Sequence, residues 1–172
     1  MKIPDNYHRF LDLNKFHVFI DRIFFQQQID IMHKNFDAAI DKLKIIQILL
    51  DQHIRDEEEL LLPLYTKFVS PIPLGGAVEF YIREHKQIVR YISDFIDKIS
   101  MWDGNTKNID LEIVRLFDTY YKFKHLVEHH DTREDTFLYR YLDKMIEKKQ
   151  KRDVLNLIVE RQNRLLDQLN GI

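Results

Sequence analysis

The 172-residue sequence contains no cysteine. That absence excludes disulfide bonds, thiolate zinc sites, iron–sulfur ligation and thiol catalysis together. Glycine and proline are scarce, with four of each, and neither occurs between Pro4 and Pro63. Long stretches without these two residues lack the punctuation of turns and favour helix.

Charge and hydropathy exclude further classes of protein. The net charge of −2 leaves no basic surplus for nucleic acid. No apolar run reaches the roughly 18 residues that a membrane helix needs, and the opening MKIPDNYHRF lacks the apolar core of a signal peptide. We therefore expect no nucleic-acid partner, no membrane span and a cytoplasmic location. With 45% apolar side chains, residues 1–172 can form one domain with its own core.

Apolar residues recur at spacings of three and four along four successive stretches, beginning with Leu13, Phe16, Ile20 and Phe24. This periodicity predicts four amphipathic helices. Polar or glycine- and proline-containing segments separate them, at 34–37, 70–76 and 102–108. The predicted fold is all-α, an antiparallel up-down-up-down four-helix bundle over residues 10–145.

A fifth amphipathic stretch, predicted as an additional C-terminal helix over residues 150–170, follows the bundle. Its apolar stripe consists of Leu155, Ile158, Leu165, Leu166 and Leu169. Such a stripe either packs back on its own bundle or binds a protein partner or a second copy of the chain as a homodimer. The sequence leaves both interpretations open.

Each of the four predicted bundle helices carries one histidine on its apolar face. At about 100° per residue, His17, His53, His85 and His130 share their faces with leucine, isoleucine and phenylalanine. One buried histidine is commonly satisfied by a backbone carbonyl. Four of them need four separate hydrogen-bond solutions, whereas a bound metal satisfies all of them together. The pattern therefore favours a metal centre.

The remaining histidines are assigned by helical position. His8 and His33 lie off the inward face and are interpreted as surface residues. His125 and His129 stay as rivals of His130, because a turn centred between the third and fourth helices puts His125 level with the histidine of the third helix.

Two of the inward histidines are followed four residues later by a glutamate. The stretch HIRDEEELLLP contains His53 and Glu57, and the stretch HDTREDTFLYR repeats the pattern with His130 and Glu134. Side chains at i and i+4 lie on one helical face, about 6 Å apart. Pro63 is expected to kink the helix just past the first pair.

The order His, His-x-x-x-Glu, His, His-x-x-x-Glu on four successive helices resembles the hemerythrin-like, or HHE cation-binding, domain family. The resemblance covers about residues 10–145. It implies two iron ions in an oxo- or hydroxo-bridged di-iron centre inside the bundle. The implied metal ligands are terminal nitrogens and two bridging carboxylates, from His17, His53, Glu57, His85, His130 and Glu134. Mixed imidazole and carboxylate donors without thiolate also suit iron on chemical grounds.

The sequence departs from the oxygen carriers of that family. Those carriers place a second histidine one turn before the inward histidine of the third helix, where this chain has Tyr81. Six protein ligands supply about eight of the twelve donor contacts that two six-coordinate ions need, and the oxo or hydroxo bridge supplies two more. Roughly two positions are left for water, O2, NO or small anions. We expect such ligands to bind in an apolar setting, and we expect no stable reversible oxygen carriage. The apolar neighbours predicted around the site are Ile20, Phe24, Leu50, Ile88 and Phe123.

The sequence thus predicts a di-iron protein that reacts with or senses O2, NO or peroxide, or handles iron. One alternative is an interaction module that uses its C-terminal helix, with the bundle as scaffold. Another is a di-iron peroxidase or NO reductase. Iron content separates the interaction module from the other two, and turnover with peroxide or NO identifies an enzyme.

Overall fold

The computed structural model describes residues 6–103 and 105–170 of the chain, and these residues form helices, turns and no strand. The predicted all-α class is confirmed. The α-helices are α1 (Asn14–Met32), α2 (Phe36–Asp56), α3 (Leu62–Phe68), α4 (Val78–Ser100), α5 (Ile109–Arg133), α6 (Arg140–Met145) and α7 (Lys148–Asn170). Short 3-10 segments, η1 (Phe10–Leu13) and η3 (Leu74–Gly76), precede α1 and α4. The described residues of the breaks predicted at 70–76 and 102–108 lie between α-helices, whereas the break predicted at 34–37 overlaps the first two residues of α2.

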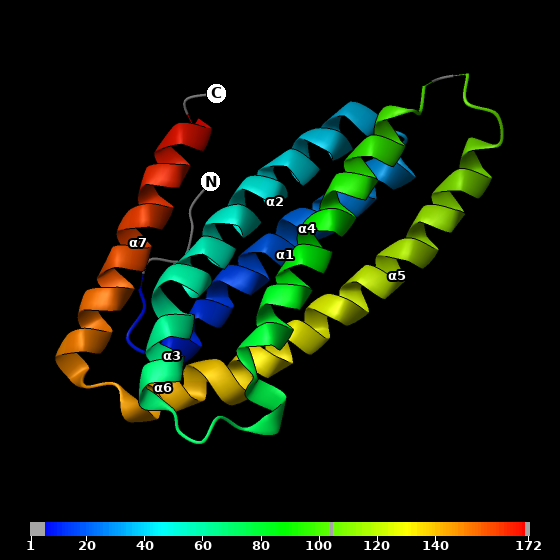
Figure 1. Ribbon diagram of the computed structural model, residues 1–172. Coiled ribbons are helices and arrows are strands. Elements are labelled where there is room, and N and C mark those ends of the chain that lie inside the picture. The colour runs from blue at the N-terminus through cyan, green and yellow to red at the C-terminus, as the bar shows by residue number, and fades with distance from the viewer. Residues whose placement is uncertain (1–5, 104, 171–172) are drawn as a thin grey trace.

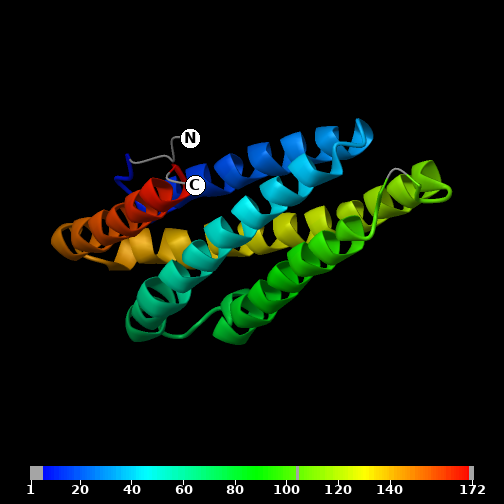
Figure 2. The same ribbon diagram turned by 90° about the horizontal axis from the view of Figure 1, so that it is seen from above.

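The helices α1, α2, α4 and α5 lie along one another in both views (Figures 1 and 2). The helix α7 begins at the end of the molecule that carries α3 and α6 and runs beside α2 (Figure 1). The turn between α1 and α2 and the loop between α4 and α5 lie at the opposite end. In the described part of the chain, no helix combines the length and the apolar character that crossing a membrane requires.

Two π-helical segments interrupt the long helices at the same relative position. The segment η2 (Glu57–Leu61) joins α2 to α3, and η4 (Glu134–Tyr139) joins α5 to α6. Each begins at one of the two predicted glutamate ligands, and such bulges are frequent at functional sites. Pro63 follows η2 at the start of α3, where its missing N–H interrupts the helical hydrogen-bond ladder least. Neither π-helical segment contains a proline, and no proline follows η4 in α6.

The core consists of two buried apolar clusters. The first lies between the α1–α2 turn and the predicted ligands, and it includes Phe24, Ile46, Phe95, Tyr120 and Phe123. The second lies at the α3–α6 end and is rich in tyrosine. Its members include Tyr7, Leu61, Tyr65, Tyr81, Leu138, Tyr139, Leu155 and Ile158.

The apolar stripe of α7 is covered by the chain itself. Leu155, Ile158 and Leu166 are buried, and Leu165 and Leu169 pack against the first apolar cluster. The structure therefore supports the interpretation in which α7 packs back on its own bundle. Partner binding or homodimer formation through α7 stays a prediction. The stripe that motivated it is not exposed.

The segment before α4 packs closely on η4. A side chain at Gly76 would collide with the hydroxyl of Tyr65 and would come within 2.9 Å of Phe137 Cβ. Only glycine leaves room for this approach. The carbonyl of the neighbouring Gly75 accepts a short hydrogen bond from Arg133 Nη1. The loop at 70–76 is thereby tied to the end of α5.

Candidate metal centre

The structure brings all six predicted ligands into one buried cluster in the interior. One group of mutually close donor atoms contains Glu57, His85, His130 and Glu134, and a second contains His17, His53 and Glu134. Glu134 belongs to both groups and therefore links them. The side chains of His17 and His53 retain 10% and 7% exposure, whereas both glutamates are at most 1% exposed.

The four histidines direct the same ring nitrogen, Nε2, toward the two carboxylates. Nε2 of His17 lies 3.3 Å from Glu134 Oε2, and Nε2 of His130 lies 2.6 Å from Glu134 Oε1. Nε2 of His85 lies 3.1 Å from Glu57 Oε2, and Nε2 of His53 lies 3.7 Å from the same atom. Convergence of imidazole and carboxylate donors from four helices is the arrangement that a buried cation requires.

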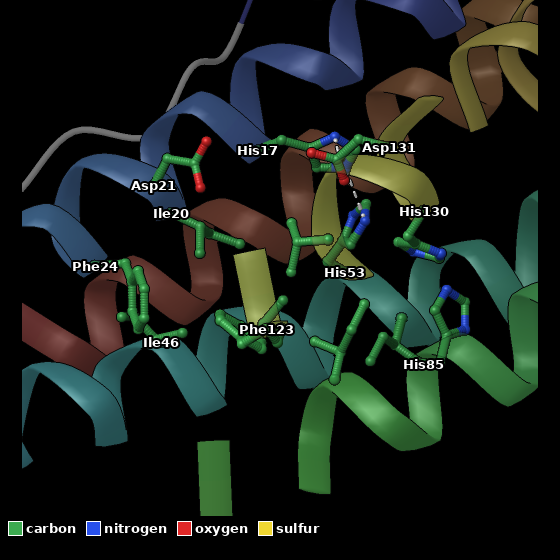
Figure 3. Close-up of a pocket in the computed structure, with 14 residues that line it drawn as sticks. His17, Ile20, Asp21, Phe24, Ile46, His53, His85, Phe123, His130 and Asp131 are labelled. Atoms are coloured by element: carbon green, nitrogen blue, oxygen red, sulfur yellow. Dashed lines mark hydrogen bonds and ion pairs between the residues drawn. The ribbon is translucent and has the colours of Figure 1, made fainter. Parts of the chain in front are cut away.

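The two halves of the cluster contain unusually close pairs of rings. His17 Nε2 and His53 Nε2 are 3.0 Å apart, as the dashed line in Figure 3 shows. The rings of His85 and His130 meet edge to face with centroids 4.8 Å apart. Two protonated imidazoles so close would repel each other. Two neutral ones facing each other through their lone pairs need a shared proton or a cation between them.

One carboxylate oxygen in the cluster is left without a hydrogen bond. Glu134 Oε1 is buried and has no partner of hydrogen-bonding geometry, although ring nitrogens of His130, His85 and His53 lie 2.6, 3.9 and 4.0 Å away. A buried acceptor without a donor is costly. The donor set is therefore one that a metal ion fits, and the structure itself leaves the kind of metal open.

Carboxylates also contact the outward ring nitrogen, Nδ1, of three of the histidines. Nδ1 of His85 lies 2.9 Å from Glu58 Oε1, Nδ1 of His130 lies 3.1 Å from Glu84 Oε2, and Nδ1 of His17 lies 3.5 Å from Asp131 Oδ1. A carboxylate at Nδ1 holds the proton there and leaves Nε2 free as a metal donor. The sequence did not identify Glu84 or Asp131 as part of the site.

Two arginines bind carboxylates next to the cluster. Arg133 contacts both oxygens of Glu84, with Nη2 3.1 Å from Oε1 and Nε 3.1 Å from Oε2. Arg161 of α7 donates to Asp56 Oδ1 at 3.1 Å and to Glu59 Oε2 at 2.9 Å. Asp56 is buried directly before Glu57, and this contact ties it to α7.

The pKa values of the two central glutamates are shifted in opposite directions. Burial and the neighbouring Glu134 carboxylate raise the pKa of Glu57 to about 7. Burial would also raise the pKa of Glu134, but the imidazoles of His130 and His17 outweigh it and hold that pKa well below its usual range. Like charges this close cannot both be ionised without a counterion. A metal ion would supply that counterion.

The pKa values of His85 and His53 are also shifted in opposite directions. Burial would lower the pKa of His85, but the nearby carboxylates of Glu134 and Glu57 raise it to about 9. Burial, with His17 nearby, pushes the pKa of His53 well below its usual range. Without metal the cluster therefore mixes charged and neutral imidazoles. Metal binding must displace the protons.

The rival histidines lie outside the cluster. His125 is 68% exposed in its side chain, and His129, His8 and His33 are exposed as well. Tyr81, which stands where the oxygen carriers have a second histidine, is buried, with its hydroxyl 3.4 Å from the carbonyl oxygen of Arg133. The tyrosine that reaches the carboxylates is Tyr139, which the sequence did not identify.

An apolar cavity adjoins the histidines on one side. It has a volume of about 40 Å³, room for a few waters or a diatomic molecule. All five predicted apolar neighbours line it, together with the four histidines and Asp131. Figure 3 shows Phe24, Ile46 and Phe123 on one side of the histidine rings.

Comparisons of this chain with protein-family models, with curated proteins and with solved structures found no match. The assignment of the site therefore depends on its geometry and chemistry.

Proposed function

We propose that this protein is a hemerythrin-like di-iron protein whose four-helix, up-down-up-down bundle holds two iron ions. The observation that carries the proposal is the convergence of four Nε2 atoms on two buried carboxylates, one of which belongs to both donor groups. His17, His53, His85 and His130 would supply terminal nitrogens. Glu57 and Glu134 would bridge the ions, and Glu134 is placed between the two groups as a bridge requires.

Iron is proposed over other metals on the chemistry of the donors. The set combines imidazole and carboxylate without thiolate, which suits iron in either common oxidation state. When bound, the pair of ions would supply redox chemistry toward small ligands. Glu58, Glu84 and Asp131 would keep the protons on the Nδ1 atoms of the histidines that they contact. The apolar wall of the cavity would exclude bulk water.

The proposed role is reaction with, or sensing of, O2, NO or peroxide, or the handling of iron, in the cytoplasm. The apolar cavity beside the histidines supports this role, because it admits small and weakly hydrated molecules to the cluster and leaves no room for larger substrates. The rival role as an interaction module has less support, since α7 covers its apolar stripe within the chain.

Metal analysis tests the proposal. Protein purified from iron-supplied cells should contain about two irons per chain and show the electronic spectrum of an oxo- or hydroxo-bridged ferric pair. The reduced protein should bind NO, and the oxidised protein should show new absorption with azide. Protein that carries a single zinc, or no metal, after iron supply would contradict the proposal.

A further inference from the structure

The hydroxyl group of Tyr139 is a donor that the proposed ligand set does not use. The side chain is fully buried, and its oxygen lies 2.6 Å from Glu57 Oε1 and 3.1 Å from Glu134 Oε2. Its ring centroid is 6.3 Å from that of His17. The phenol oxygen thus lies between the two carboxylates that would bridge the ions.

The carboxylate oxygens beside Tyr139 are the ones directed away from His130 and His85. Glu134 Oε2 is 3.3 Å from His17 Nε2 and 3.1 Å from the oxygen of Tyr139, whereas Glu134 Oε1 is 2.6 Å from His130 Nε2. Glu57 Oε1 contacts the oxygen of Tyr139, whereas Glu57 Oε2 is 3.1 Å from His85 Nε2. The phenol therefore lies on the His17 side of the two carboxylates.

The spacing of these atoms fits ligands of one ion. Neighbouring donors about 2.0–2.1 Å from an octahedral ion are about 2.9 Å apart. The separations from Tyr139 to the two carboxylates, 2.6 and 3.1 Å, lie on either side of that value. The hydroxyl of Tyr81, in contrast to that of Tyr139, is directed to the backbone carbonyl of Arg133.

From this geometry we infer that Tyr139 is a seventh protein ligand, bound as phenolate to the ferric ion of the group formed by His17, His53 and Glu134. The inference rests on the proposed di-iron function. As the oxygen binds the ion, the O–H bond breaks and one proton leaves to water. The charge of the ion offsets the cost of a buried phenolate. Of the roughly two positions left open by six ligands, Tyr139 fills one, and the other stays exchangeable.

Spectroscopy of iron(III)-loaded protein tests the inference directly. Ferric phenolate produces a visible charge-transfer band, and excitation in that band enhances the ring vibrations of the bound tyrosine in the Raman spectrum. The wild type should show both features. Tyr139→Phe should lose them completely while the matched variant Tyr81→Phe keeps them, with iron content measured in all three proteins.

If Tyr139→Phe fails to fold, two measurements on the wild-type protein still test whether Tyr139 is a ligand. Growth with ring-deuterated tyrosine should shift the enhanced vibrations, and loading with redox-inert gallium(III) should produce the ultraviolet difference spectrum of one ionised tyrosine per chain. Iron-loaded wild type without any phenolate feature would overturn the inference and leave the di-iron proposal intact. The same features surviving in Tyr139→Phe would overturn it too, whereas protein that binds no iron would overturn the proposed function itself.

Discussion

On the side of the metal centre that faces the α1–α2 turn, the walls are aliphatic and aromatic, and a cavity of about 40 Å³ reaches the histidines. On the opposite side the space is filled by tyrosines and by the carboxylate–arginine pairs. The helices α1, α2, α4 and α5 line the cavity, whereas the tyrosine-rich cluster comes mainly from η1, η2, α3, η4, α6 and α7. Under the proposed function, one side would admit small ligands and the other would fix the donors and their protons.

Truncation after Gln150 should have the largest effect, because it uncovers residues of both apolar clusters. Leu155, Ile158 and Leu166 are buried, and each such side chain contributes about 1.5–3 kcal/mol when buried. Their loss is comparable with the whole stability of a small domain, about 5–15 kcal/mol. We expect the truncated chain to lose its cooperative thermal transition by circular dichroism. A truncated chain that still unfolds cooperatively and still binds iron would show that α7 only assists assembly.

Replacing the shared carboxylate should abolish the centre without abolishing the fold. Glu134→Ala removes the only residue common to both donor groups, so we expect iron content to fall from about two per chain to near zero. Glu57→Ala should also lower it sharply. His33→Ala and Glu128→Ala, at exposed positions, are the controls and should load normally. Normal loading of Glu134→Ala, measured by elemental analysis, would place the metal elsewhere.

Removing one supporting carboxylate should weaken metal binding without preventing it. Glu84→Ala removes the carboxylate that contacts His130 Nδ1 and pairs with Arg133, and loss of such support typically costs about 10–100-fold in metal affinity. Competition with a chelator measures the change. The exposed Glu79 of the same helix provides the control, and equal affinities for Glu79→Ala and Glu84→Ala would show that the contact does not support the ligand.

Filling the cavity should have the smallest effect and should act on the apolar side alone. Leu50→Phe narrows the cavity lined by this residue, so we expect azide to bind the ferric protein about tenfold more weakly, or roughly 1.4 kcal/mol, with iron content unchanged. Ile48→Phe, a partly exposed position on the same helix outside that cavity, is the control. Loss of iron in Leu50→Phe would mean that the apolar side also holds the ligands in place.

The sequence by itself determined which residues could form the centre. Helical periodicity put His17, His53, His85 and His130 on inward faces, and the i, i+4 spacing added the two glutamates. These are local properties of a helix, set by its repeat. The lack of glycine and proline between Pro4 and Pro63 also favoured helix in that stretch.

Only the tertiary structure decided which neighbours support those residues. The contacts of Glu84 with His130, of Tyr139 with Glu57 and of Arg161 with Asp56 join positions 46, 82 and 105 residues apart. They depend on the register of packed helices and on the π-helical segments, which no local repeat reports. A turn centred between α4 and α5 puts His125 level with His85, yet the structure pairs His85 with His130. Register follows from loop path and side-chain packing, and these exist only in the folded chain.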